Sequence, residues 1–189
     1  MQSAAQTLFG EVFQFSSEEE QVINSCFKSL TTEKNEILLQ KGTVARHMYL
    51  VVKGCLRVYL TDEVNNESTR FLIFENQLGT AFPSFILQQP SSASIQSLGV
   101  SEVLTLSYED REKLMQVFPI IETSFRRGIE IDYINAIQRI EGLITLDAKT
   151  RYQELLKKSP HIVQKLPSRI VADYLGISQE TLSRLKSKR

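Results

Sequence analysis

Residues 166–186 have the sequence LPSRIVADYLGISQETLSRLK. Apolar residues recur at helical spacing on both sides of Gly176, so we predict two short amphipathic helices here. The glycine can adopt the left-handed backbone conformation that ends a helix, and Ser178 follows as the N-cap of the second helix. Ala172 is small at the point where the two helices must cross closely. The stretch therefore predicts a helix-turn-helix, the motif that places its second helix in the major groove of DNA.

The charge of the chain is distributed unevenly. The whole sequence has 22 Lys and Arg residues and 22 Asp and Glu residues. Residues 149–189 contain ten Lys and Arg against three Asp and Glu, so they carry +7 and residues 1–148 carry −7. A basic segment attached to an acidic body concentrates positive potential where a polyanion can dock.

The N-terminal part is predicted to be helical over residues 17–40. Ser17 is followed by three glutamates, the pattern of an N-cap with acids in the first turn, where the helix dipole favours them. Apolar residues then recur at helical spacing from Val22 to Leu30. A second short helix is expected after Leu30, running toward Leu39.

Residues 48–107 are predicted to form short antiparallel strands. Residues 48–52 are rich in β-formers, and residues 55–60 alternate as in a half-buried strand. The further expected strands are 68–74, 93–98 and 102–107. Short strands separated by regular turns indicate an antiparallel β-barrel of the jelly-roll, or double-stranded β-helix, type.

The longest predicted helix begins at Pro119 and ends at Leu146. Its apolar residues are spaced by steps close to 3.6 and form one stripe: Ile121, Phe125, Ile129, Ile134, Ile137, Ile140 and Ile144. The stripe either lies across the barrel or packs on the same helix of a second copy, and its length favours pairing. Residues 147–158 are expected to form a further helix.

The helix-turn-helix segment resembles the recognition motif of the Crp/Fnr family of transcription regulators. The resemblance rests on residues 172–184, ADYLGISQETLSR, and it extends to residues 41–59, which are similar to the opening of that family's cyclic-nucleotide-binding barrel. The helix from Pro119 matches the family's dimerisation helix in place and length. The short end after Arg184 resembles a Bacteroidetes-type subgroup.

The resemblance implies an α+β protein with three parts. Residues 1–118 would form a cyclic-nucleotide-binding-like β-barrel sensor, residues 119–146 the dimerisation helix, and residues 147–189 a winged-helix-like helix-turn-helix. A homodimer would form through the middle part and bind a near-palindromic site on double-stranded DNA. RNA polymerase would be a further partner.

The resemblance also implies that Gln179, Glu180 and Arg184 contact bases. Arg184 can pair with guanine, Glu180 can accept from the amino group of cytosine, and Gln179 can bond to adenine. An arginine is more usual at the first of these positions, so Gln179 implies a changed base preference. The remaining candidate DNA contacts, to phosphates or from outward positions of the second helix, are Ser168, Arg169, Ser178, Thr181, Ser183 and Lys186.

The expected ligand pocket departs from the family's pattern. Cyclic-nucleotide binders of this family carry a Gly-Glu pair and, after a loop, an Arg followed by Ser or Thr and Ala. The matching residues here are Gly79-Thr80 and Ser91-Ser92, so Thr80 replaces the glutamate and Ser91 replaces the arginine. A buried cyclic phosphate would lack its charge partner, and cAMP and cGMP are therefore disfavoured. The serines bind an unknown effector or only satisfy their loop.

Other functions and cofactors are disfavoured by what the sequence lacks. Cys26 and Cys55 cannot supply the four thiolates of an iron–sulfur cluster, and His47 is more typical of a structural histidine than of a haem ligand. A cupin-type metal enzyme would need several histidines in the barrel, so no metal site, catalytic residue or enzyme activity is predicted.

No apolar run approaches the roughly 20 residues of a membrane span, and we expect a cytoplasmic protein. The alternative to a DNA-binding regulator is a ligand-binding sensor that acts through protein partners without specific DNA binding.

Overall fold

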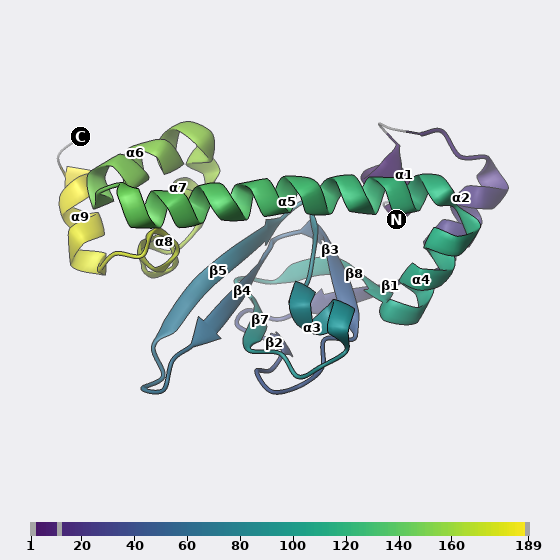
Figure 1. The fold of residues 1–189 in the computed structure, drawn as a ribbon, viewed down its shortest axis with the longest axis horizontal. Helices are drawn as coiled ribbons and strands as arrows, with labels where there is room; N and C mark the ends of the chain where they lie inside the picture. Colours follow the sequence, from purple (N-terminus) through teal and green to yellow (C-terminus); the bar gives the residue numbers. More distant parts are fainter. Residues whose placement is uncertain (1–2, 11–12, 188–189) are drawn as a thin grey trace. The chain divides into compact units, whose positions relative to one another are not determined.

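The chain, as described by a computed structural model over residues 3–10 and 13–187, divides into two units. The first comprises Met1–Thr61 and Arg70–Arg127, and the second comprises Asp62–Thr69 and Gly128–Arg189. The chain passes between the units within one helix, α5 (Pro119–Thr145). It also passes between them around the tip of the hairpin formed by β4 (Cys55–Thr61) and β5 (Glu67–Phe74), so this tip belongs to the second unit (Figure 1).

Two four-stranded sheets form the framework of the first unit (Figure 1). One sheet has the order β1 (Phe27–Thr32), β8 (Ser101–Ser107), β3 (His47–Lys53), β6 (Leu78–Gly79). The other has the order β2 (Ile37–Leu39), β7 (Ala93–Ser97), β4, β5. This strand order is that of a jelly roll. The sheets do not close into the predicted barrel, because each has its own edge strands; the unit is a β-sandwich.

Successive side chains of β3 point to opposite faces of its sheet, and both faces are buried. Tyr49 points between the sheets, where its hydroxyl donates to the backbone carbonyl of Leu38 in β2 at 3.2 Å. Burial raises the pKa of Tyr49 to about 12. Leu50 has the opposite orientation and is also fully buried. Helices therefore cover the outer face of this sheet: α1 (Ala4–Phe9), α2 (Ser17–Ser25), α4 (Tyr108–Val117) and the start of α5 contribute to the same hydrophobic core. The remaining helix of this unit, α3 (Phe82–Leu87), connects β6 to β7.

The predicted helix over residues 17–40 is wrong beyond Ser25. Its start is a capping box one residue earlier than expected, in which Ser16 Oγ accepts from the backbone N–H of Glu19 at 3.3 Å and the Glu19 carboxylate accepts from the N–H of Ser16. Residues 27–32 instead form β1, which pairs antiparallel with β8. The hydrogen bonds of this long-range pairing outweigh the helical spacing of the local apolar residues.

Four short helices accompany the later part of α5 in the second unit (Figure 1). They are α6 (Ala148–Lys158), α7 (Pro160–Lys165), α8 (Ser168–Leu175) and α9 (Gln179–Ser187). Buried Tyr152, Ile162, Val171 and Leu182 form their core. Residues 128–187 contain no strand and α9 continues through Ser187, so the described residues show no hairpin wing and the winged-helix part stays a prediction.

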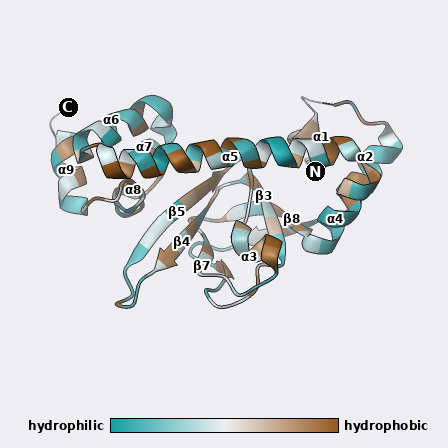
Figure 2. Cartoon of the chain, viewed as in Figure 1, coloured by the Kyte–Doolittle hydropathy of each residue, from teal (hydrophilic) through white to brown (hydrophobic). Residues whose placement is uncertain are grey.

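The apolar stripe of α5 changes character along the helix. Ile121 is fully buried in the first unit, whereas the side chains of Ile129, Tyr133, Ile140 and Ile144 are between 37% and 77% exposed. Hydrophobic residues recur along the whole helix (Figure 2). Polar residues interrupt them, and within the described residues no helix, α5 included, is long and apolar enough to cross a membrane.

Two glycines with positive φ provide a test of the sandwich. Gly54 has φ +100° and lies against Ser101, whose Cβ would be 2.8 Å from an added methyl group; Gly42 has φ +90° and open space around it. We expect Gly42→Ala to cost about 1–2 kcal/mol through backbone strain alone. Gly54→Ala should cost a further ~1–3 kcal/mol through overpacking, measured by urea unfolding. Equal losses in the two variants would contradict the close packing at Gly54.

Candidate nucleic-acid interface

The turn between α8 and α9 is built on Gly176. This residue has φ 66° and ψ 41°, and the N–H of Ile177 bonds to the carbonyl of Ala172 at 3.0 Å, which closes the end of α8 as in a Schellman motif. A Cβ at Gly176 would lie 3.1 Å from Cδ2 of Leu143 on α5. The backbone conformation favours glycine, as the sequence predicted, and a larger side chain would also press against Leu143.

Ser178 begins the next helix, also as predicted. Its Oγ accepts from the backbone N–H of Thr181 at 3.1 Å, so it satisfies one of the free amide groups at the start of α9. Leu182 is fully buried and holds α9 against the helical core, and Ile170 and Val171 do the same for α8. The opposite side of α9 is left free to face solvent.

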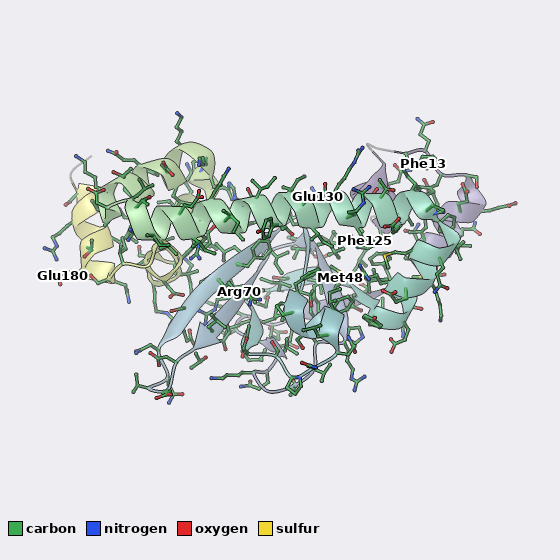
Figure 3. The ribbon with its side chains drawn as sticks, in the orientation of Figure 1. Phe13, Met48, Arg70, Phe125, Glu130 and Glu180 are labelled. Atoms are coloured by element: carbon green, nitrogen blue, oxygen red, sulfur yellow. The ribbon has the colours of Figure 1, made fainter. Side chains whose placement is uncertain are left out.

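Most of the residues predicted to contact DNA are exposed, on α9, just before it or at the start of α8. Seven of the nine are exposed: Ser168, Arg169, Ser178, Gln179, Glu180, Ser183 and Arg184; Thr181 and Lys186 are half-buried. Lys186 Nζ bonds to Ser168 Oγ at 2.8 Å, so the end of α9 meets the start of α8. Glu180 lies at the outer surface of α9 (Figure 3) and forms an ion pair with Arg184 at 3.3 Å. This pair is highly exposed and contributes little stability, so either side chain can exchange it for another partner.

Two arginines that the sequence analysis missed complete the end of α8. Arg139 on α5 donates to the carbonyl of Tyr174 at 2.6 Å, and its guanidinium lies 4.7 Å from the centre of the Tyr174 ring. Arg151 on α6 donates to the carbonyl of Leu175 at 3.1 Å. The last carbonyls of α8 thus have charged donors from two other helices. No local pattern points to these contacts, because the partners are 35 and 24 residues apart.

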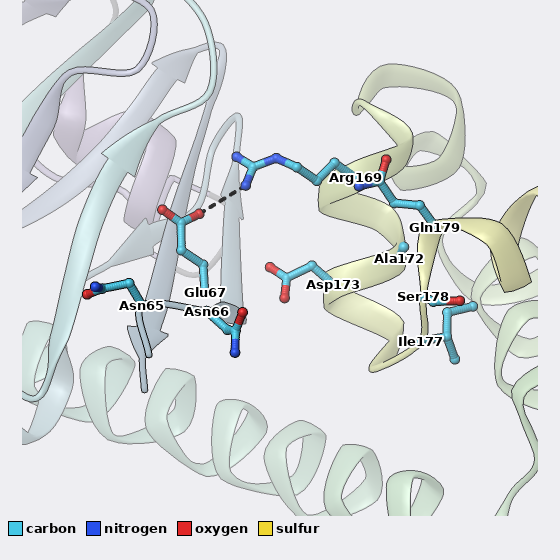
Figure 4. A pocket seen from close by; sticks show the side chains of 9 residues that line it. All are labelled: Asn65, Asn66, Glu67, Arg169, Ala172, Asp173, Ile177, Ser178 and Gln179. Atoms are coloured by element: carbon cyan, nitrogen blue, oxygen red, sulfur yellow. Dashed lines mark hydrogen bonds and ion pairs between the residues drawn. The ribbon is translucent and has the colours of Figure 1, made fainter. Parts of the chain in front are cut away.

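The hairpin tip, Asp62–Thr69, is the other feature that the sequence analysis missed. Thr69 donates to the Asp173 carboxylate from its backbone N–H at 2.8 Å and from its hydroxyl, and its carbonyl accepts from Arg139. Glu67 forms an ion pair with Arg169 at 3.3 Å (Figure 4). Between the tip and the α8–α9 pair lies an open cleft of about 430 Å³, lined by Asn65, Asn66, Glu67, Arg169, Ala172, Asp173, Ile177, Ser178 and Gln179.

Three of the four residues of the expected ligand pocket contact other parts of the sandwich. Thr80 Oγ1 donates to the carbonyl of His47 at 2.8 Å, and Ser91 Oγ bonds to both the N–H and the carbonyl of Ala93. Ser92 is exposed. Gly79 has Ile73 packed on it: Cγ1 of Ile73 is 2.8 Å from the position that a Cβ would take. The hydroxyls are thus occupied by backbone groups and the space over Gly79 is filled.

Comparison with known proteins places this architecture in a recognised class. Residues 30–118 match the family model of the cyclic nucleotide-binding domain, so this part of the chain is similar to that domain. The chain as a whole has the fold of the Crp/Fnr transcription regulators. Comparison with curated protein sequences finds no match.

Three solved regulators illustrate the likeness. FixK2 from Bradyrhizobium japonicum is 16% identical with a TM-score of 0.75, and the match covers 86% of this chain and 83% of FixK2. A CooA variant from Carboxydothermus hydrogenoformans is 18% identical with a TM-score of 0.73, and the match covers 100% of this chain and 84% of CooA. The c-di-GMP-responsive regulator CLP of Xanthomonas campestris is 15% identical with a TM-score of 0.71, covering 92% and 91%.

The residues present do not fit the cyclic nucleotide that the domain family implies. A cyclic phosphate needs a cation and free donors in its cradle, whereas the cradle positions Thr80 and Ser91 are neutral and their hydroxyls bond to backbone groups. The Ile73 side chain fills the space beside Gly79, with Cγ1 2.8 Å from the position that a Cβ would take. Among the described residues, no group of three His, Cys, Asp or Glu side chains is placed to hold a metal ion.

Arg139 provides a test of how the α8–α9 pair is supported. Arg139→Met keeps the length of the side chain but removes the charged hydrogen bonds to the carbonyls of Thr69 and Tyr174. We expect a loss of about 2 kcal/mol in the free energy of unfolding, because buried carbonyls lose charged donors. Arg127→Met, an exposed position on the same helix, is the control and should change stability by less than about 0.5 kcal/mol. A null result for Arg139→Met would show that these bonds do not support α8.

Proposed function

We propose that this chain is a sequence-specific DNA-binding transcription regulator in which α8 and α9 form a helix-turn-helix. The observation that carries the proposal is the two-sided character of α9. Leu182 is fully buried and fixes the helix, while Gln179, Glu180 and Arg184 are exposed on its other side. These three side chain types can form the hydrogen bonds that distinguish bases in the major groove.

Charge supports the same proposal. Residues 149–189, which include α7 to α9 and all of α6 but its first residue, carry +7. Ser168, Arg169, Ser178, Thr181, Ser183 and Lys186 would supply contacts to phosphates or flanking positions. Such contacts fix the register of a protein on the duplex and make its affinity salt-dependent.

The proposed regulator is a homodimer that pairs along α5. The exposed residues Ile129, Tyr133, Ile137, Ile140 and Ile144 follow one another at steps of three or four, so they share one face of the helix. A second copy of the same face covers them with matching apolar side chains. Two α9 helices would then enter successive major grooves, roughly 34 Å apart, on a near-palindromic site.

In this proposal the sandwich does not bind cAMP or cGMP, and any effector is of another kind. The support is the occupied hydroxyls of Thr80 and Ser91 and the packing of Ile73 on Gly79. A regulator of this kind works in the cytoplasm beside RNA polymerase, has no catalytic residue and needs no bound cofactor for its contact with DNA.

Selection of duplexes from a random DNA library by the purified full chain, without added ligand, tests the DNA-binding function. We expect enrichment of a palindrome with half-sites about one helical turn apart. Arg184→Ala should weaken binding to that site by about 10- to 100-fold, the value of one specific base contact. Lys157→Ala, which removes one exposed positive charge from α6, is the matched control and should weaken binding far less.

Absence of any enriched sequence would contradict the regulator and favour the alternative, a sensor that acts through protein partners. Enrichment that is insensitive to Arg184→Ala would show that α9 does not contact the bases. A single unpaired half-site would contradict the dimer.

Calorimetric titration tests whether the sandwich binds cAMP or cGMP. We expect no saturable heat with cAMP or cGMP up to about 1 mM, a ceiling that corresponds to roughly 4 kcal/mol of binding free energy. The 5′-monophosphates serve as controls for weak surface binding of a nucleotide. Saturable binding of cAMP that is lost in Ser91→Ala would overturn this part of the proposal.

A further inference from the structure

The hairpin tip lies against the surface that is proposed to bind DNA. It is part of the second unit, together with α8 and α9. Its residues Asn65, Asn66 and Glu67 line the same cleft as Ser178 and Gln179 at the start of α9 (Figure 4). The side chains predicted to meet a phosphate and a base therefore face a segment of their own chain.

The tip is held in place by specific bonds. Thr69, only 2% exposed, gives both its N–H and its hydroxyl to Asp173 of α8 and receives Arg139 on its carbonyl. Farther out, the Asp62 carboxylate accepts from the N–H groups of Val64 and Asn66 at 3.0 and 2.8 Å, so the loop has a defined shape. The segment is thus an ordered element of the unit.

The charge of the tip is opposite to what DNA binding requires. Residues 62–69 contain Asp62, Glu63 and Glu67 and no Lys or Arg. Glu67 pairs with Arg169, a predicted phosphate contact, and the two side chains are 31% and 59% exposed. A phosphate that approaches Arg169 must displace this carboxylate, and the negative charge of the tip opposes its approach.

We propose that the hairpin tip is an autoinhibitory element, with Glu67 as the side chain that withholds Arg169 from DNA. The inference rests on the proposed DNA-binding function. The phosphates of the duplex must compete with the Glu67 carboxylate for Arg169, and this competition lowers the affinity for DNA. Because both side chains are partly exposed, the cost is that of a surface ion pair, enough to tune affinity and not to abolish it.

Glu67→Gln in the full chain tests the proposal, with affinity measured by fluorescence anisotropy on the selected duplex. Removing the carboxylate keeps the size of the side chain and should tighten binding about two- to fivefold, the range expected of a surface ion pair. Glu63→Gln removes the same charge from the exposed side of the same tip, and its gain should be smaller. In an Arg169→Ala background the gain from Glu67→Gln should vanish.

The outcomes separate this inference from the function on which it rests. If the wild type binds its site and Glu67→Gln leaves the affinity unchanged or weaker, the autoinhibitory role is wrong and the regulator stands. Equal gains from Glu63→Gln, or a gain that persists without Arg169, would overturn the role of the ion pair. If neither the wild type nor Glu67→Gln binds any duplex, the DNA-binding function is wrong, and the inference that rests on it is wrong too. Circular dichroism confirms that each variant is folded.

Discussion

The C-terminal end of α8 is the constraint on which the second unit depends. A helix leaves its last four carbonyls without partners, and here all four are satisfied. Two accept from the backbone beyond the helix, and two accept from arginines on other helices: Ala172 from Ile177, Asp173 from Gly176, Tyr174 from Arg139 and Leu175 from Arg151. The same bonds that end α8 also determine where α9 begins. The orientation of the proposed base-contacting face therefore depends on residues that never approach DNA.

One guanidinium connects the elements of this unit. Arg139 lies on α5, bonds to the carbonyl of Tyr174 in α8 and also bonds to the carbonyl of Thr69 in the hairpin tip. Since a guanidinium presents several donors in a rigid plane, it holds two acceptors in a defined relation. The proposed dimer helix, the first helix of the DNA-binding pair and the inhibitory tip thus share one polar centre.

The sandwich keeps its strand order although the residues at its cradle positions are neutral. Its strand order is that of a jelly roll and its sequence matches the cyclic nucleotide-binding domain. At the cradle, however, Thr80 and Ser91 bond to backbone groups and Ile73 packs on Gly79. Strand pairing depends on backbone hydrogen bonds and apolar alternation, which these replacements leave intact. Ligand binding depends on a few side chains, so these side chains can change while the fold is kept.

The sequence by itself determined the features that local physics controls: the turn at Gly176, the cap at Ser178, the exposed face of α9 and the strands β3, β4, β5, β7 and β8. It misplaced residues 27–40, because their strands exist only through pairing with residues 56 to 79 positions away in the sequence. It also predicted a closed barrel, whereas the described strands form two sheets with edge strands of their own. Only the tertiary structure decided that Arg139 and Arg151 complete α8 and that Glu67 meets Arg169. Such contacts join residues distant in the sequence, and no periodicity or motif records them.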